Sequence, residues 1–130
     1  MAYLLDTNIV IHARDGTDRV LDNFVEHENQ IAISTLCFAE LQRGIYKTGE
    51  ESQLRRLRLE VLLPRIPVLP FDQSAAERYG RILAECGWSR ARDFDRMIAA
   101  QALVLGYSLV TDNVADFSDI SGLNLENWAA

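Results

Sequence analysis

Positive charge is scarce in this chain. Its 13 lysine and arginine residues are outnumbered by 19 aspartate and glutamate residues, and its single lysine is Lys47. The formal net charge is therefore −6. A protein that coats nucleic acid is normally basic, so this balance argues against that class. It is compatible with an enzyme that meets phosphate through a bound divalent cation, because such an ion reverses the local field.

Other features are absent too. No apolar run approaches 18 residues, so no membrane span is expected, and no basic and apolar leader suggests export. The two cysteines, Cys37 and Cys86, lie in helical patterns; we expect free thiols in a reducing cytoplasm rather than a disulfide. His12 and His27 are isolated, so we interpret both as ordinary helix residues and expect no zinc cluster.

No linker, low-complexity segment or internal repeat divides the 130 residues, of which 48% are hydrophobic. These values are typical of a soluble globular protein with a core of its own. We therefore expect residues 1–130 to form a single domain.

Short apolar strands alternate with amphipathic helices along the chain. Strands are expected at 2–5, 30–33, 66–69, 108–110 and 123–125. Helices are expected from about residue 8, at 18–28, after Ser34 or Thr35, and at 51–63, 72–86 and 93–105. The alternation predicts an α/β fold with three layers, α/β/α, around a central parallel sheet of four to five strands.

Local signals set the limits and faces of these elements. Pro67 has no N–H group, so its strand is expected at a sheet edge or at a strand start. Ser74 and Glu77 form a capping pair, and Gly49 and Gly106 are expected to end helices. Helical spacing predicts three apolar faces: Leu21, Phe24 and Val25; Phe38, Leu41 and Ile45; and Leu54, Leu57, Val61 and Leu62.

Acidic residues recur at the ends of the predicted elements. Asp6 follows the first strand, Asp95 opens an apolar helix, and Asp112 and Asp116 follow the strand 108–110, while Glu40 lies on a helix. In parallel sheets, sites form outside the carboxyl ends of the strands. Convergent carboxylates are the ligands of hard divalent cations, which can activate a water for phosphodiester hydrolysis. The acids therefore predict one shared metal pocket.

Each acid also has a simpler interpretation. Asp6 can be only the N-cap of the first helix, and Glu40 can point to solvent. Asp95 can be a first-turn acid favoured by the helix dipole. Asp112 or Asp116 can cap a short turn. Asp93 competes with Asp95, and we assign it a capping or surface role because Asp95 lies nearer the apolar helix body.

Four motifs in order resemble a known family. They are Tyr3-Leu4-Leu5-Asp6-Thr7-Asn8, Phe38-Ala39-Glu40-Leu41 with Gly44, Asp95-Arg96-Met97-Ile98-Ala99-Ala100, and Leu109 to Asn113 with Asp116-Phe117. Together they resemble the PIN domain, and above all its VapC-type bacterial toxins. The resemblance implies an endoribonuclease that depends on Mg²⁺ or Mn²⁺, is neutralised by a VapB-like antitoxin in a type II toxin–antitoxin system, and commonly pairs as a homodimer in the cytoplasm.

The resemblance assigns roles by position. Asp6, Glu40 and Asp95 match the three central catalytic acids, and Asp116 matches the fourth. Asp6 and Asp95 would hold the principal metal, while Glu40 and Asp116 complete its ligands or position the water.

Neighbouring polar residues take supporting roles in the same resemblance. Thr111 matches the polar residue that orients the pocket, and Asp112, where relatives often have asparagine, is an extra acid for the metal or for its ligands. Thr7 and Asn8 would donate hydrogen bonds to the metal ligands, with helix capping as the alternative.

The segment before the third acid departs from the family pattern. Relatives often carry an Ile-Gly-Pro-like turn there, whereas this chain has Ala91-Arg92-Asp93-Phe94. Arg90, Arg92 and Arg96 could bind RNA phosphates at the mouth of the pocket, or they could form a solvated face that neutralises nearby acids. The cluster Arg55, Arg56 and Arg58 is interpreted as a solvated face.

Surface and aromatic residues carry further expectations. In relatives an antitoxin helix docks where Tyr46, Leu54, Leu57 and Leu62 lie, although here these residues can equally be core. We expect Trp88 to pack rather than to sit at a subunit contact. Trp128 is expected to fasten the last segment to the sheet.

Two other functions are weighed against the nuclease. Haloacid-dehalogenase-like phosphatases need an aspartate where Asn8 stands, and they and response-regulator receivers use a lysine near the phosphate, whereas Lys47 lies on the wrong helix. No glycine-rich phosphate loop ending in Gly-Lys is present. The remaining alternative is a PIN-fold binding module without nuclease activity.

Overall fold

The computed structural model of the chain describes residues 2–46 and 50–130, so Lys47 and Gly49 lie outside the described residues. Five strands form one parallel sheet in the order β3-β2-β1-β4-β5. The strands are β1 Tyr3–Leu5, β2 Ile31–Ser34, β3 Val68–Leu69, β4 Ser108–Val110 and β5 Leu125–Glu126.

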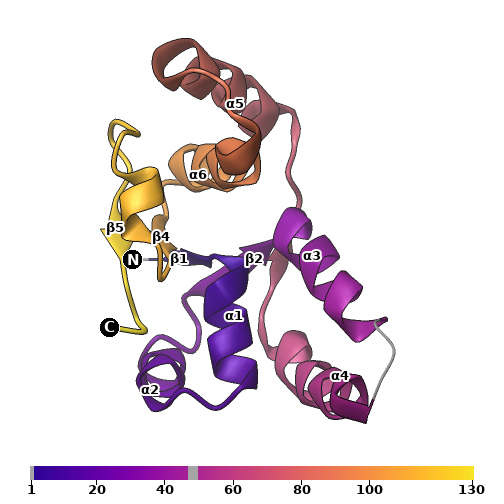
Figure 1. The fold of residues 1–130 in the computed structure, drawn as a ribbon. Coiled ribbons are helices and arrows are strands. Elements are labelled where there is room, and N and C mark those ends of the chain that lie inside the picture. Colours follow the sequence, from indigo (N-terminus) through magenta and orange to yellow (C-terminus); the bar gives the residue numbers. More distant parts are fainter. Residues whose placement is uncertain (1, 47–49) are drawn as a thin grey trace.

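Helices cover both faces of this sheet. Helices α5 and α6 lie on one side, and α1, α2 and α4 lie on the other, with α3 running beside β2 (Figure 1). The α-helices are α1 Thr7–Arg14, α2 Asp18–Glu26, α3 Thr35–Ile45, α4 Glu50–Leu62, α5 Gln73–Cys86 and α6 Asp93–Leu105. Short 3₁₀ turns follow at η1 Leu63–Arg65, η2 Arg90–Arg92 and η3 Val114–Phe117. The predicted three-layer α/β/α fold is confirmed.

The strand order reverses beside β1. From β1 the chain builds outward to β2 and β3, and it then returns to add β4 and β5 on the other side. Ligands of open parallel sheets bind at such a reversal, outside the carboxyl ends of the strands. Leu5 pairs with Val110 in register, so the residues that follow, Asp6 and Thr111, come side by side at this point.

The neighbouring strands β1 and β4 are buried on both faces, as their unbroken apolar sequence predicts. Leu4, Leu5 and Leu109 have no exposed surface, and burying a leucine side chain contributes about 1.5–3 kcal/mol. Trp128 packs edge-on against Tyr3 and is 4% exposed. It fastens the C-terminal segment to the sheet, as expected.

Several local predictions are confirmed. Pro67 precedes β3, which is an edge strand. Ser34 caps α3 by accepting a hydrogen bond from the Leu36 amide at 3.0 Å. Gly106 ends α6 in the left-handed conformation, with φ of 71°, where a residue with a Cβ would be strained. No described helix is long and apolar enough to cross a bilayer.

The predicted apolar faces of α2 and α4 are partly wrong. Val25 on α2 is 77% exposed. On α4, Leu57 is 59% and Val61 70% exposed, and the buried residue is Leu59, at 1%. Among the described elements, α4 makes its main contacts with α1, α3 and η1, which cover only part of its surface. Of the apolar stripe read from the sequence, Leu54, Leu57 and Val61 face solvent, whereas Leu62 packs partly against the core.

The predicted cap of α5 and the predicted packing of Trp88 are also wrong. Asp72 is the N-cap and accepts a hydrogen bond from the Ala75 amide at 3.0 Å. The helix begins one residue before Ser74, which therefore lies within its first turn. Trp88 is 63% exposed.

Candidate metal-dependent active site

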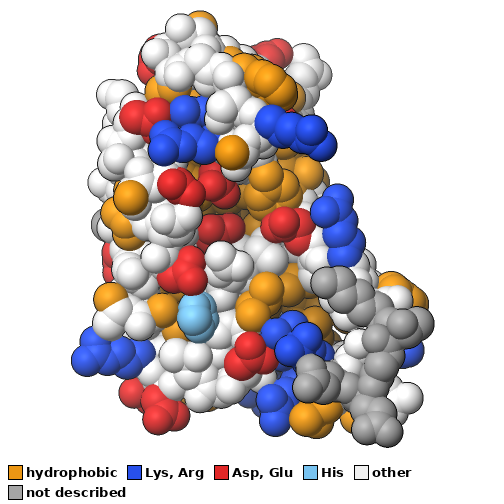
Figure 2. All heavy atoms as spheres, viewed as in Figure 1, with side chains coloured by type: hydrophobic (Ala, Val, Ile, Leu, Met, Phe, Trp, Pro, Cys, Tyr) orange, Lys and Arg blue, Asp and Glu red, His pale blue; other side chains and the backbone are white. Residues whose placement is uncertain are grey.

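Three carboxylates from separate segments line one cavity of about 370 Å³ at the reversal point of the sheet: Asp6, Glu40 and Asp95. Thr7, Asn8, Ile11, Ala91, Phe94 and Asn113 complete its walls. Figure 2 shows acidic side chains gathered in the middle of this face, between α6, α3 and α1, with lysine or arginine side chains around them. The sequence placed the acids on different elements, and the fold brings them to one cavity.

Asp6 stands at the end of β1 and caps α1. Its Oδ1 accepts a hydrogen bond from the Thr7 amide at 2.8 Å, and its Oδ2 accepts one from the Thr111 hydroxyl at 3.0 Å. The residue is only 7% exposed. Burial raises the pKa of Asp6; the two hydrogen bonds oppose the rise, and the charges of Glu40 and Asp112 add to it. Helix capping and lining of the cavity are thus combined in one residue.

Glu40 does not point to solvent, which was the simpler interpretation of its position. Its Oε1 accepts a hydrogen bond from the Thr7 hydroxyl at 2.5 Å. Thr7 therefore touches two acids of the cavity, Asp6 through its amide and Glu40 through its hydroxyl. A single residue at the start of α1 fixes both carboxylates.

Asp95 has the largest resolved pKa shift among these acids. Its pKa is raised from the usual 3.8 to about 6, first by burial and then by the charges of Asp6, Asp116 and Glu40. Arg92 opposes it. Two effects that disfavour the ionised form, burial and like charge, therefore meet at this carboxylate. Such a combination in a cavity is typical of functional sites.

Asp116 lies beside the cavity on η3. Its Oδ2 accepts a hydrogen bond from the Asn113 side-chain amide, and its Oδ1 lies 3.9 Å from Arg92 Nη2. Asn113 is a wall residue that we did not predict, although it directly follows Asp112 in the motif. Asp116 is close enough to raise the pKa of Asp95, so the fourth predicted acid acts electrostatically on the third.

Asp112 is turned toward α1. Its Oδ2 lies 3.0 Å from His12 Nε2, and its Oδ1 accepts a hydrogen bond from the Asn8 side-chain amide at 3.4 Å. His12 Nδ1 in turn lies 3.3 Å from the Thr17 hydroxyl. His12 was interpreted as an ordinary helix residue, and this was incomplete. The signal was its spacing, because His12 follows Asn8 by four residues and shares its helix face.

The three candidate RNA-binding arginines have different surroundings. Arg96 is 3% exposed, and its guanidinium donates to both carboxylate oxygens of Asp119 at 2.9 and 3.4 Å. Arg96 therefore fixes the segment after η3 to α6 and is not presented to RNA, which corrects the prediction for this residue. Arg90 is exposed and Arg92 half-buried, so both remain accessible.

The donor set suits a hard divalent cation. Carboxylate and hydroxyl oxygens line the cavity, and no His or Cys does. As the described side chains stand, no three Asp, Glu, His or Cys groups are close enough to hold one ion together. Mg²⁺ needs fewer, because it usually takes one or two carboxylates and completes its ligands with waters and substrate phosphate. The cavity, with Asp6, Glu40 and Asp95 in its lining, offers carboxylates in that smaller number.

The His12–Asp112 contact gives a testable prediction about the loop that carries Thr111. We expect His12→Ala and Asp112→Ala each to lower the free energy of unfolding by about 1 kcal/mol, since each leaves a polar partner unpaired. The double variant should lose less than the sum by about 0.5–1 kcal/mol, because the residues are coupled. Urea unfolding at pH 7 measures all three losses.

The exposed Arg56–Glu60 pair, at 3.0 Å on α4, is the control for this cycle. Its coupling should be about 0.3–0.5 kcal/mol. If the losses in the free energy of unfolding at His12 and Asp112 were strictly additive, the two residues would not stabilise the loop through their contact.

The sequence matches the PIN domain over residues 3–123. The chain belongs to the PIN-domain family. It is 33% identical over 133 residues to Ribonuclease VapC2 of Rickettsia felis, covering 98% of each protein. It is also 33% identical over 135 residues to the tRNA(fMet)-specific endonuclease VapC of Shigella flexneri, covering 99% of each.

A solved structure agrees with this assignment to the PIN-domain family. VapBC2 from Rickettsia felis, bound to a DNA fragment from its promoter, superposes with a TM-score of 0.85 at 32% identity, covering 98% of this chain and 99% of that one. PIN nucleases generally use divalent metal ions, in keeping with the oxygen donors of the cavity.

Proposed function

We propose that this PIN-domain chain is the ribonuclease toxin of a VapBC-type toxin–antitoxin pair. It hydrolyses RNA phosphodiester bonds with Mg²⁺, or Mn²⁺, held principally by Asp6 and Asp95, with Glu40 and Asp116 completing the site. One observation carries the proposal: carboxylates from β1, α3 and α6 line a single cavity at the reversal point of the sheet.

The chemistry divides between the ion and the chain. When bound, the ion lowers the pKa of a water and neutralises the scissile phosphate. The chain orients the carboxylates beforehand, since Thr7 and Thr111 hold Asp6, and Thr7 also holds Glu40. Burial and like charge make the cleft unfavourable for ionised acids, so a bound cation would relieve a repulsion that the fold imposes. Such prior orientation keeps the reorganisation needed for reaction small.

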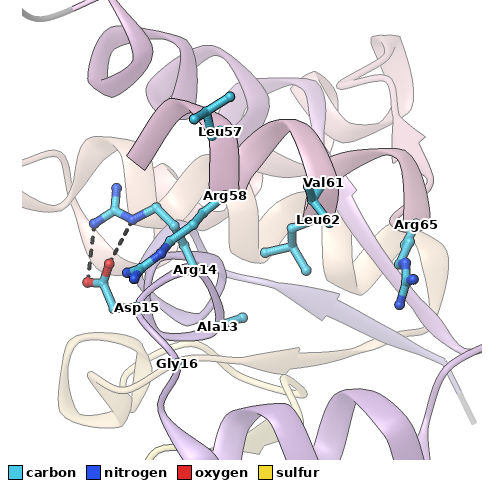
Figure 3. Close-up of a pocket in the computed structure, with 9 residues that line it drawn as sticks. All are labelled: Ala13, Arg14, Asp15, Gly16, Leu57, Arg58, Val61, Leu62 and Arg65. Carbon is cyan, nitrogen blue, oxygen red and sulfur yellow. Dashed lines mark hydrogen bonds and ion pairs between the residues drawn. The ribbon is translucent and has the colours of Figure 1, made fainter. Parts of the chain in front are cut away.

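A VapB-like antitoxin is the proposed protein partner, and the exposed stripe of α4 is its proposed binding surface. A groove of about 570 Å³ lies between the end of α1 and α4, with Leu57, Val61 and Leu62 along α4. Figure 3 shows Arg58 near the Arg14–Asp15 pair at one end of the groove and Arg65 at the other. An apolar strip between arginines suits an amphipathic segment that carries carboxylates.

The proposal has three further parts. Residues 1–130 act as one domain, since the five strands share one sheet and its core. The chain pairs as a homodimer, as its family commonly does. Its place is the cytoplasm, where its RNA substrate is found and where thiols such as Cys37 and Cys86 stay free.

RNA cleavage by the purified chain tests the proposal. Wild type should cut RNA when Mg²⁺ or Mn²⁺ is added and stop when a chelator is added. Asp6→Asn should lower the rate on the order of 10³-fold, because losing about 4 kcal/mol of transition-state stabilisation gives that factor. Asp22→Asn, the same change at an exposed acid on α2, should leave the rate unchanged.

Growth of cells that express the chain alone gives an independent readout. Wild type should arrest growth, Asp6→Asn should not, and co-expression of the antitoxin should relieve the arrest. Cleavage that ignores the chelator or survives in Asp6→Asn would overturn the metal mechanism. A folded wild type that binds RNA or antitoxin but cuts nothing would instead establish the binding module.

A further inference from the structure

Trp88 is an exposed aromatic residue that neither the fold nor the acidic cavity uses. It lies in the segment between α5 and η2, and 63% of it is accessible. The other tryptophan of the chain, Trp128, is 4% exposed and packs in the core. Leaving a large apolar ring in water forgoes the favourable free energy of its burial. The ring is therefore accessible to a ligand.

The loop that presents Trp88 is fixed at both ends. Gly87 ends α5 with φ of 79°, and its amide donates to the Leu83 carbonyl at 2.9 Å. The Cys86 thiol donates to the Asp119 carbonyl at 3.4 Å, and Arg96, just beyond the loop, binds the Asp119 carboxylate at 2.9 Å. Asp119 thus ties both sides of the loop to the segment after η3. An aromatic ring on such a loop loses little conformational freedom when it binds.

Two accessible arginines, Arg90 and Arg92, follow Trp88 closely in the sequence. Arg90 is exposed and has no ion-pair partner among residues 2–46 and 50–130. Arg92 reaches Asp116 and Asp119 only at 3.9 and 3.8 Å. Asp119 is already neutralised by the shorter contact with Arg96. Arg90 and Arg92 are therefore available to an anion.

The loop leads directly into the acidic cavity. Ala91, between the two arginines, is a wall residue of the cavity, as is Asp95. Trp88 precedes Ala91 by three residues, so their backbones lie within about 11 Å even if the segment is fully extended. A polymer whose phosphate occupies the cavity would reach Trp88 with a neighbouring unit.

We propose that the loop 87–92 is a subsite for single-stranded RNA, with a base stacked on Trp88 and flanking phosphates bound by Arg90 and Arg92. The inference rests on the proposed ribonuclease function and specifies how its substrate is held. Stacking on aromatic rings combined with a cationic path along the backbone is how single strands are bound without a duplex groove. Docking of a second copy of the chain on Trp88 is less favourable, because that copy would have to cover the two accessible arginines.

Steady-state cleavage of a short single-stranded RNA with Mg²⁺ tests the subsite. Trp88→Ala should raise KM about 10–100-fold, the range that loss of one stacked base gives, and leave kcat within about 2-fold. Trp88→Phe keeps a ring and should stay within about 3-fold of wild-type KM. Val25→Ala, at an exposed apolar residue on α2, should change neither constant.

Tryptophan fluorescence reports the contact directly. In an Asp95→Asn background, which keeps the RNA intact, the oligonucleotide should quench the solvent-exposed emission of Trp88. The buried emission of Trp128 should remain as an internal reference, and Trp88→Phe should abolish the quenching.

Distinct outcomes separate this inference from the proposed function. Unchanged KM and unchanged quenching in Trp88→Ala would overturn the subsite. So would a Trp88→Ala variant that loses dimerisation by light scattering while its KM stays the same, which would assign the ring to a subunit contact. A wild type that cuts no RNA but shows quenching that depends on Trp88 would overturn the nuclease and support the subsite.

Discussion

Asp95→Asn is expected to abolish RNA cleavage and, in the absence of metal, to make the protein more stable. Asparagine keeps the shape of the side chain but removes one of the two charges proposed to hold the ion, so we expect a loss on the order of 10³-fold or more. When no cation is bound, the same charge is unfavourable, because burial and three neighbouring acids raise the pKa of Asp95 to about 6. Activity and stability should therefore change in opposite directions.

The sign of the pH dependence follows from that pKa. The unfolded chain releases the Asp95 proton near the usual 3.8, and the folded chain holds it to about 6. Between these values the folded state binds more protons, so the contribution of Asp95 to stability falls as pH rises. The loss is complete above about pH 6. A full shift corresponds to about 3 kcal/mol, and screening of this half-buried group reduces the expected value to about 1–2 kcal/mol.

Urea unfolding with a chelator at pH 4 and pH 7.5 measures this contribution. The free energy of unfolding of Asp95→Asn should exceed that of wild type by about 1–2 kcal/mol at pH 7.5, and the two values should converge at pH 4. Mg²⁺ should then stabilise wild type, because the ion binds only the folded state, and should have little effect on the variant. Asp22→Asn should show neither effect. A metal-free Asp95→Asn protein less stable than wild type at pH 7.5 would contradict the electrostatic account.

The sequence predicts well those parts of the fold that depend on the residues of one short segment alone. The apolar run Tyr3-Leu4-Leu5, the left-handed Gly106 and the edge strand after Pro67 each follow from properties of one segment. The carboxyl-end rule then brings Asp6 to the reversal point of the sheet. No tertiary information is needed for these steps.

The errors arise where an outcome depends on a second segment. Whether Leu57 and Val61 are buried depends on how much of α4 its neighbours cover, and they cover the side that carries Leu59 and part of Leu62. Likewise, Arg96 is read as an RNA ligand until Asp119, 23 residues later, is seen to bind it. Periodicity identifies an apolar face but does not tell whether the same chain or a partner covers it.

The exposed stripe of α4 leads to the second large expected effect, the loss of antitoxin control. Leu57→Asp combined with Val61→Asp would place two carboxylates in the apolar part of the groove (Figure 3). Burying them under an antitoxin helix costs enough free energy that we expect affinity to fall at least about 100-fold. Both side chains are exposed, at 59% and 70%, and neither lines the acidic cavity, so the fold and the cavity should be unaffected.

The double variant should therefore cut RNA like wild type yet escape neutralisation. The measurements are titration of purified antitoxin into the cleavage assay, and growth of cells that co-express both proteins. Val104→Asp, at an apolar residue on α6 that is 42% exposed, is the matched control and should remain neutralised. If the double variant stays fully neutralised, the antitoxin binds another face of the chain, and the proposed docking surface on α4 is wrong.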